Sequence, residues 1–290
     1  MKKVLFIIPV LAALVSCNKE TALQSISNDS PREICFTVDD GFSAEAATKA
    51  TSAVTSLSSF YVAAATGTAG SADAYAWGPV SFTGSTSYTG GKYWPASNPS
   101  YHFYASNVSM TCTANSAPTI AATNGTDVVC AYLASPTYNA SNALSFNHIF
   151  ARLGKTTVTV QSGYTASNIS ITITPKTGGT YNLLTGNAKT DGTGWSSTTN
   201  GSAVTLATST GETAATDVYL VPGSYTITAT YTLTKGDYTI TKSSVTKTVS
   251  IKGGAVNAIK ATIGGASASD ITFTVSVAAW GSNEVSPSFS

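Results

Sequence analysis

The stretch GSYTITATYTLTKGDYTITKSSVTKTVSI, residues 223–251, alternates apolar side chains with Thr and Ser over much of its length. Alternation with a period of two is typical of a β-strand that buries one face and exposes the other. Lys235-Gly236-Asp237 supplies turn residues, and the chain returns through Tyr238 and Ile240. The sequence therefore predicts a long β-hairpin whose first strand buries one row of side chains: Tyr225, Ile227, Ala229, Tyr231 and Leu233.

Short strands of the same kind recur on both sides of this hairpin. Clear examples are predicted at 33–38, 57–64, 126–133, 169–173 and 271–277. Many short strands with turn signals between them, and no long helical period, indicate antiparallel β-sandwiches. Residues 161–167 contain Gly163 and show no periodicity, so we expect a domain boundary there. The predicted fold is all-β, with one sandwich over 33–163 and a second over 164–290.

Composition narrows the classes of function. Hydrophobic residues make up 42% of the chain, which allows a genuine core. Charged residues make up only 10%, against roughly 25% in typical soluble domains. The formal net charge is +1 and no basic block occurs. The electrostatic pattern of a nucleic-acid-binding protein is therefore missing, and we expect no nucleic-acid partner.

The amino terminus has the layout of a bacterial secretory signal. Lys2 and Lys3 precede an apolar run, residues 4–15, which is too short to span a bilayer as a permanent helix. Leu14-Val15-Ser16-Cys17 resembles the lipobox of bacterial lipoproteins, which implies cleavage before Cys17 and attachment of lipid to its thiol. We expect residues 1–16 to be the signal, 17–32 to be a polar tether, and the protein to be an outer-membrane lipoprotein exposed at the surface.

Three further cysteines remain after lipidation of Cys17, namely Cys35, Cys112 and Cys130. An exported protein can form disulfides, and an odd number leaves at least one thiol over. If a pair forms, Cys112 with Cys130 is our choice, and its short loop would contribute about 3 kcal/mol. Three unpaired, mostly buried thiols are an equally good interpretation.

Catalytic groupings are hard to assemble. The two histidines, His102 and His148, stand in no metal-ligand spacing. The adjacent carboxylates Asp39 and Asp40 are explained by a solvated turn, and His148, flanked by Phe146 and Ile149, by a structural role. We expect no catalytic residue, no metal, no cofactor and no enzyme activity.

Aromatic residues crowd together between Trp77 and Tyr104. Such a stretch most often forms core, since aromatic side chains bury large areas. Two other interpretations are a platform for stacking sugars and an interface for a protein partner. A surface glycan-binding lipoprotein would use exposed rings, with Trp77, Trp94 and Trp195 as candidates. Trp195 stands out because it follows Gly192-Thr193-Gly194, a loop that gives little reason for burial, although packing of this ring on its own domain is the favoured interpretation.

Several segments, taken in order, resemble the fimbrillins of Bacteroides-type bacteria, which are lipoprotein precursors of pilus subunits. The match covers nearly the whole mature chain. The segments that carry the resemblance are Leu57-Ser-Ser-Phe-Tyr-Val62, Gly91-Lys-Tyr-Trp-Pro95, Tyr101-His-Phe-Tyr-Ala105, Phe146-Asn-His-Ile-Phe-Ala-Arg-Leu153, Val218-Tyr-Leu-Val-Pro-Gly-Ser-Tyr225 and Ile271-Thr-Phe-Thr-Val-Ser-Val277 followed by Trp280.

The resemblance implies two tandem transthyretin-like β-sandwiches that polymerise by strand exchange with other fimbrial subunits. A protease removes the first strand, and a strand from the next subunit fills the groove. Here the displaced strand would present Ile34, Phe36 and Val38, and the cut would fall in the loop 41–56. Family processing follows an arginine, whereas this loop offers only Lys49. Arg32 precedes the strand, so a cut there would leave the groove occupied.

The donor strand is left open by the resemblance. The tail, residues 281–290, contains only two large apolar residues, Val285 and Phe289, and Pro287 weakens it as a central strand. The strand predicted at 271–277 is a better candidate for the donor, but its own subunit needs it for its fold. If no cleavage occurs, Cys17 is a permanent anchor and the subunit keeps its first strand.

Overall fold

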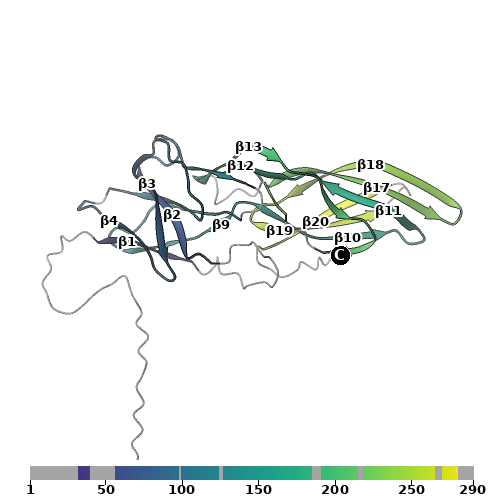
Figure 1. Cartoon of the computed structure of the whole chain (residues 1–290), viewed down its shortest axis with the longest axis horizontal. Coiled ribbons are helices and arrows are strands. Elements are labelled where there is room, and N and C mark those ends of the chain that lie inside the picture. Colours follow the sequence, from purple (N-terminus) through teal and green to yellow (C-terminus); the bar gives the residue numbers. More distant parts are fainter. Residues whose placement is uncertain are drawn as a thin grey trace, which may run out of the picture.

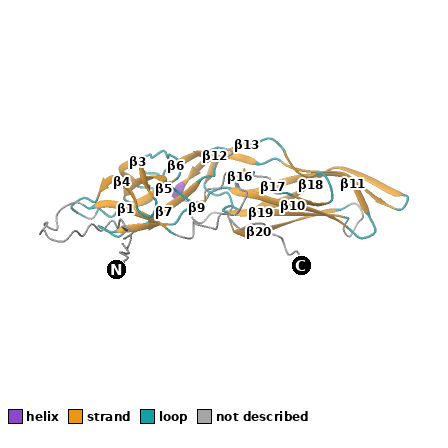
Figure 2. Ribbon diagram, turned by 60° about the horizontal axis from the view of Figure 1, so that its bottom comes forward, coloured by secondary structure: helices purple, strands orange, loops and turns teal. Residues whose placement is uncertain are grey.

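The computed structural model describes residues 32–39, 56–97, 99–123, 127–184, 191–214, 218–264 and 270–279. Over these residues the chain is an elongated stack of β-sheets (Figure 1). The first half of the chain forms one end and the long β17–β18 hairpin forms the other, and strands account for nearly all of the regular structure (Figure 2). Among the described residues, no helix is long and apolar enough to cross a membrane.

The first half of the chain builds one eight-stranded sheet. Its strands, in the order of their hydrogen-bonded neighbours, are β8 (Ser141–Leu144), β1 (Glu33–Val38), β4 (Tyr88–Tyr93), β3 (Ala74–Gly84), β2 (Ser59–Thr66), β5 (His102–Ser106), β7 (Val129–Leu133) and β9 (Asn147–His148).

Strand β2 shows why the apolar run at its start folds as it does. Phe60, Val62 and Ala64 face one apolar core, which also contains Ile34 and Phe36. The alternate residues of β2, Ala63 and Ala65, face a second core. A strand covered on both faces carries apolar residues at successive positions. This explains why residues 57–64 read as nearly continuous apolar sequence.

A three-stranded sheet follows in the middle of the molecule. It has the order β13 (Trp195–Asn200), β12 (Lys176–Asn182), β6 (Thr119–Ala122). The core beneath it joins residues from both halves of the chain, because Tyr104 and Ile120 pack in the same cluster as Tyr181 and Tyr219. Both halves of the chain therefore contribute side chains to this middle core.

The second half forms two further sheets around a core of its own. Their strands are β10 (Ala151–Val160), β15 (Gly211–Thr213), β16 (Tyr219–Leu220), β19 (Ala255–Ile263) and β20 (Ile271–Ala279) in one, and β11 (Thr165–Ile173), β14 (Val204–Ala207), β17 (Gly223–Lys235) and β18 (Tyr238–Ile251) in the other.

The predicted hairpin is present as β17 and β18, which pair from Gly223 with Ile251 to Lys235 with Tyr238. Gly236 turns the chain with φ of +57°, a left-handed conformation that glycine adopts without strain. The alternating apolar row of β17 is buried in the second-half core, with exposures between 0% and 5%. The all-β fold class and the sandwich character are confirmed.

Two details of the organisation differ from the sequence analysis. Strand β10 precedes the expected boundary at residue 163, yet all of its described partners (β15, β16 and β19) follow it. The last strand assigned to the first sandwich thus pairs with the second half, and the two-domain division stays a prediction. In addition, β1 with β8 and β10 with β19 are parallel pairs, whereas an antiparallel sheet was expected throughout.

Candidate functional site

The predicted displaceable strand, β1, lies inside a sheet. It pairs antiparallel with β4, where Phe36 stands opposite Tyr88. On its other side it pairs parallel with β8, from Cys35 opposite Ser141 to Val38 opposite Leu144. The strand thus occupies a slot with a hydrogen-bonding wall on each side. Taking it away would leave two strands with unpaired backbone groups, which is the condition that favours the addition of another strand.

The side chains of β1 fill the apolar floor of this slot. Ile34 and Phe36 are both 0% exposed. The Phe36 ring lies edge-on to Phe82 and Phe103, with ring centroids 5.2 and 5.0 Å away. Val38 is only partly buried, at the margin of the same core. Burial of each large side chain contributes about 1.5–3 kcal/mol, so the slot strongly favours an occupant with bulky residues two positions apart.

Both ends of β1 are tied to the slot by polar contacts. At the start, the Trp94 N–H donates to the carbonyl of Arg32 at 2.8 Å, and the Gly91 N–H donates to Glu33 Oε1 at 3.0 Å. At the end, the Asp39 N–H donates to the carbonyl of Leu144 at 3.1 Å, and the Ser145 hydroxyl donates to the Asp39 carboxylate. A replacement strand would find the backbone donors and acceptors of these walls available to it.

The cysteines are placed differently from the expected pair. Cys112 and Cys130 are both free thiols, so the Cys112–Cys130 disulfide is not formed in this structure. Cys130 is buried on β7 and Cys112 is half-buried. Burial raises the pKa of the Cys112 thiol to about 11 and that of Cys130 to about 12. Cys35 is only 6% exposed, although the strand pattern placed it opposite the apolar row.

The tryptophans proposed as sugar contacts pack into the protein. Trp94 is 1% exposed, and its ring lies against Tyr101, Phe103 and Tyr138. Trp195 is half-buried between Phe150 and Tyr181, with centroid distances of 4.8 and 5.0 Å. A sugar cannot stack on Trp94 in this conformation. The glycine-rich loop before Trp195 did not signal burial because the ring packs on residues distant in sequence.

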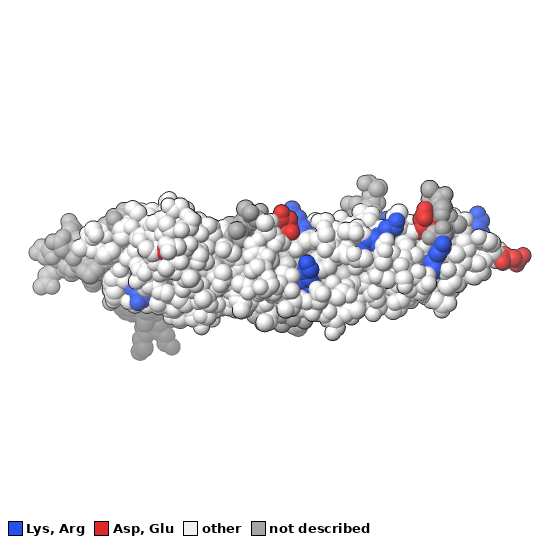
Figure 3. Space-filling view, turned by 90° about the horizontal axis from the view of Figure 1, so that it is seen from above, with Lys and Arg blue, Asp and Glu red and all other residues white. Residues whose placement is uncertain are grey.

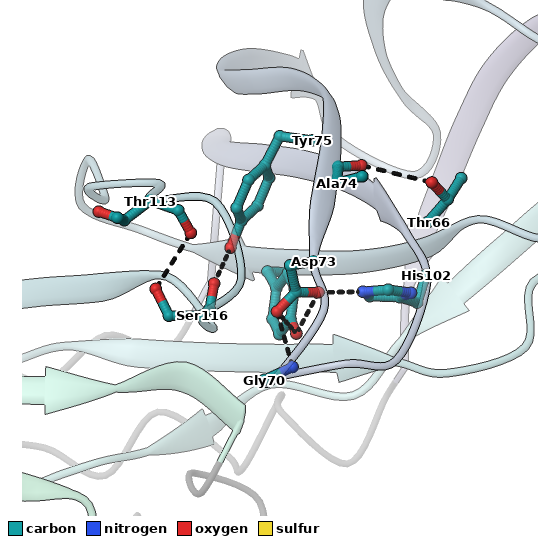
Figure 4. A network of polar contacts seen from close by, with 9 residues as sticks. Thr66, Gly70, Asp73, Ala74, Tyr75, His102, Thr113 and Ser116 are labelled. Atoms are coloured by element: carbon teal, nitrogen blue, oxygen red, sulfur yellow. Dashed lines mark hydrogen bonds and ion pairs between the residues drawn. The ribbon is translucent and has the colours of Figure 1, made fainter.

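Both histidines pair with buried aspartates that the sequence analysis missed. Asp73, 1% exposed, accepts from the Gly70 N–H at 2.6 Å and the Tyr104 hydroxyl at 3.1 Å, and its Oδ1 lies 2.5 Å from His102 Nε2 (Figure 4). His148 Nδ1 similarly lies 2.9 Å from Asp127. No local pattern pointed to these aspartates, since the pairs are 29 and 21 residues apart.

The Asp73 cluster is built as a structural clasp. Both carboxylate oxygens accept hydrogen bonds, and the side-chain hydrogen bond described for His102 is the one to Asp73. Burial and the neighbouring Asp73 raise the pKa of Tyr104 well above its usual range, so its hydroxyl stays a donor. Within the described residues, no group of three His, Cys, Asp or Glu side chains could hold a metal ion.

Three elements of the expected site lie outside the described residues: the lipidation site Cys17, the processing site Lys49 and the tail 281–290. The described surface carries little charge. Figure 3 shows Lys, Arg, Asp and Glu side chains as scattered points on a largely uncharged face, most of them over the second half. This agrees with the absence of a basic block in the sequence.

The fold and the site define an all-β protein whose first strand is seated between two others. The fimbrillin-like family model matches residues 37–280. The chain therefore belongs to the fimbrillin-like family, as its sequence motifs indicated. No curated protein matches it in sequence.

Solved structures from Bacteroides and Parabacteroides species align with most of the chain. A fimbrial protein from Bacteroides vulgatus ATCC 8482 aligns with a TM-score of 0.49 at 14% identity, covering 87% of this chain and 100% of that one. A protein from Parabacteroides distasonis ATCC 8503 assigned to cell adhesion gives 0.48 at 9% identity, covering 84% and 96%. Another with that assignment, from Bacteroides uniformis ATCC 8492, gives 0.46 at 15% identity, covering 86% and 98%.

Proposed function

We propose that this chain is a structural and adhesive subunit of a cell-surface fimbria, with no enzymatic role. It is made as an outer-membrane lipoprotein precursor, loses its first strand to a protease, and polymerises by strand exchange with other fimbrial subunits. Membership of the fimbrillin-like family supports the pilus role. The observation that carries the assembly step is the position of β1 between β4 and β8.

The physical argument for exchange rests on what removal of β1 would leave. The floor of the slot would lose Ile34 and Phe36, which are fully buried, and would expose the aromatic rings around them. The walls, β4 and β8, would lose their backbone partners on β1. An exposed apolar groove lined by unpaired backbone groups is unstable in water, and a strand from another subunit satisfies both needs.

The processing step is assigned to Lys49, in the loop that follows β1. A cut there separates the lipid on Cys17 and strand β1 from the rest of the chain, so the lipid anchor is temporary in a polymerising subunit. A cut after Arg32 would leave β1 in its slot, where the carbonyl of Arg32 accepts the Trp94 N–H. Only cleavage beyond Asp39 frees the slot for a donor.

The glycan-binding alternative has no comparable support. Its candidate rings are packed against their own domain, Trp94 fully and Trp195 partly. Trp77 is half-buried and its ring face is occupied by Lys92, whose Nζ lies 5.7 Å from the ring centroid. Assembly of subunits through backbone pairing does not require these rings to be exposed.

The Lys49→Gln variant tests the processing site. In cells that assemble fimbriae, we expect the wild-type surface protein to begin at Ala50 and to form filaments in electron micrographs. The variant should keep the Cys17 lipid form and yield no filaments. Lys247→Gln, which alters an exposed lysine on β18, is the matched control and should behave as wild type. Filaments made by a wild-type chain that retains residues 17–49 would contradict this function.

A further inference from the structure

Two buried asparagines make the same set of hydrogen bonds in the two halves of the molecule. Asn142, 6% exposed, accepts from the Thr137 N–H at 2.6 Å and donates to the carbonyls of Thr137 and Ala140 at 3.1 and 3.0 Å. Its amide therefore closes the loop that leads into β8. Every hydrogen bond described for it ends within that loop.

Asn257, 0% exposed, repeats this arrangement at the loop that leads into β19. It accepts from the Lys252 N–H at 2.9 Å and donates to the carbonyls of Lys252 and Ala255 at 2.9 and 3.1 Å. In both loops the amide reaches back five residues. An amide that satisfies one backbone donor and two acceptors fixes the path of the chain just before a strand begins.

The two asparagines also occupy equivalent positions in the sheets. Asn142 stands opposite Phe36 in the parallel pair of β1 and β8. Asn257 stands opposite Leu153 in the parallel pair of β10 and β19. Each half of the chain thus lays its first strand beside a parallel strand that starts from an asparagine-closed loop. The two halves share this unit although the sequence analysis found no pattern that predicted it.

The surroundings of the two units differ in one respect that matters for assembly. Strand β19 has β20 on its other side, so it keeps a hydrogen-bonded neighbour whatever happens to β10. Strand β8 stands at the end of its sheet, where β1 is its one neighbour among the described strands. When β1 leaves, the backbone of β8 loses its ladder, and the Asn142 loop remains as a polar restraint on its path.

We propose that Asn142 is a positioning residue for strand exchange, which holds β8 in place as the parallel wall of the slot while the slot is empty. The proposal rests on the function proposed above. Because the bonds of Asn142 lie within residues 137–142, removal of β1 does not break them. Asn257 has the same chemistry, and in addition lies 3.5 Å from the carbonyl of Arg152 on the strand beside it. It is therefore an internal control.

The test measures strand uptake by the full chain after a specific cut. A site-specific protease sequence is placed in the loop 41–55, the chain is cut, and a fluorescent peptide of residues 30–40 is added in excess under mild denaturant. Fluorescence anisotropy gives the fraction of slots that hold the peptide. Wild type, Asn142→Ala and Asn257→Ala are compared, and urea melts of the uncut chains report on folding.

We expect Asn142→Ala to weaken peptide uptake at least tenfold and Asn257→Ala to change it less than twofold, while both lower the stability of the uncut chain. Equal uptake by the two variants would overturn the positioning role and leave the proposed function intact. A wild-type chain that takes up no peptide would overturn strand exchange itself. If uncut Asn142→Ala does not fold, Asn142→Ser, which keeps a hydroxyl, takes its place. We then expect peptide uptake to weaken about threefold.

A second measurement separates positioning from general stability. Amide hydrogen exchange is followed at β8 and β19 in the cut chain before and after peptide is added. Asn142→Ala should speed exchange at Ser141–Leu144 in the empty slot and show near wild-type protection once the peptide is bound. Faster exchange in both states would indicate a merely structural role and would overturn the proposal.

Discussion

At the scale of single residues, the molecule depends on a few buried polar groups whose partners come from other strands. The Asp73 carboxylate is the clearest example, since it is 1% exposed and joins the loop at Gly70 to His102 and Tyr104 on β5. A buried charge is tolerated only when it is paired and hydrogen-bonded. Removing the carboxylate leaves these donors without an acceptor in an apolar surrounding.

Asp73→Ala is therefore expected to lower the free energy of unfolding by about 3–5 kcal/mol. Urea denaturation followed by tryptophan emission measures the change. The control is Glu212→Ala, which removes the ion pair between Glu212 and Lys155. The Glu212 side chain is 49% exposed. That pair should contribute at most about 1 kcal/mol. Equal effects of the two substitutions would show that the Asp73 cluster does not act as a clasp.

Cys130 makes stability depend on pH in the alkaline range. Burial raises the pKa of this thiol from 9.0 to about 12. Below pH 9 the thiol is protonated in both states, whereas at higher pH only the unfolded chain loses the proton. The free energy of unfolding therefore falls as pH rises, by up to about 1.4 kcal/mol per pH unit, until the folded thiol also ionises.

The measurement compares urea midpoints of the wild type and Cys130→Ala between pH 8 and about pH 11. The variant should lose stability more slowly as pH rises, although the raised pKa of Tyr225, about 12, leaves part of the slope in place. Parallel curves for the two proteins would mean that Cys130 does not contribute.

At the scale of elements, β1 is the strand on which the proposed assembly depends. Its side chains alternate locally as the sequence predicted, but its importance comes from where it is inserted. Phe36 lies among Phe60, Phe82 and Phe103, all of which belong to other strands. A ring buried in this way stabilises the chain and, under the proposed function, also sets the shape of the slot that a donor strand fills.

Phe36→Ala should destabilise the full-length chain by about 3–5 kcal/mol, because it removes a fully buried ring and leaves a cavity. Tyr238→Ala is the control, since that ring is 62% exposed at the hairpin turn, and its effect should stay within about 0.5 kcal/mol. Thermal denaturation of the Phe36→Ala and Tyr238→Ala variants measures the two losses of stability. A Phe36 effect no larger than that of Tyr238 would show that β1 does not anchor its slot.

At the scale of the whole molecule, the central core couples the two ends. It contains Tyr104 and Ile120 from the first half together with Tyr181 and Tyr219 from the second. Strand β12 pairs with β6 across the expected domain boundary, and this gives the coupling a backbone component as well. Separate domains move independently unless the interface between them is large and apolar.

The coupling predicts a single unfolding transition. In differential scanning calorimetry we expect one peak, with calorimetric and van't Hoff enthalpies in agreement. Trp195→Ala, which removes the ring between Phe150 and Tyr181, should broaden or split this peak. Two resolved transitions in the wild type would instead indicate independent sandwiches with the central core belonging to one of them.

Much of this architecture could be predicted from local pattern. The period of two in residues 225–233 predicted a strand that the structure contains as β17, and Gly236 predicted its turn. The alternation of Ile34 and Phe36 predicted the buried face of β1. The order of motifs predicted the family. Strand β8 was missed because four residues, two of them buried, are too short a run to show a period.

The sequence by itself determined that this chain is a β-rich, weakly charged protein of the fimbrillin-like family, because alternation, turn residues and motif order are properties of neighbouring residues. Only the tertiary structure decided that β1 has a wall on each side, that β10 joins the second half, and that Asp73 meets His102. Those facts depend on pairings between residues far apart in the chain. Strand partners are selected by the fit of the whole core, and the sequence of one strand does not specify which strand it will pair with.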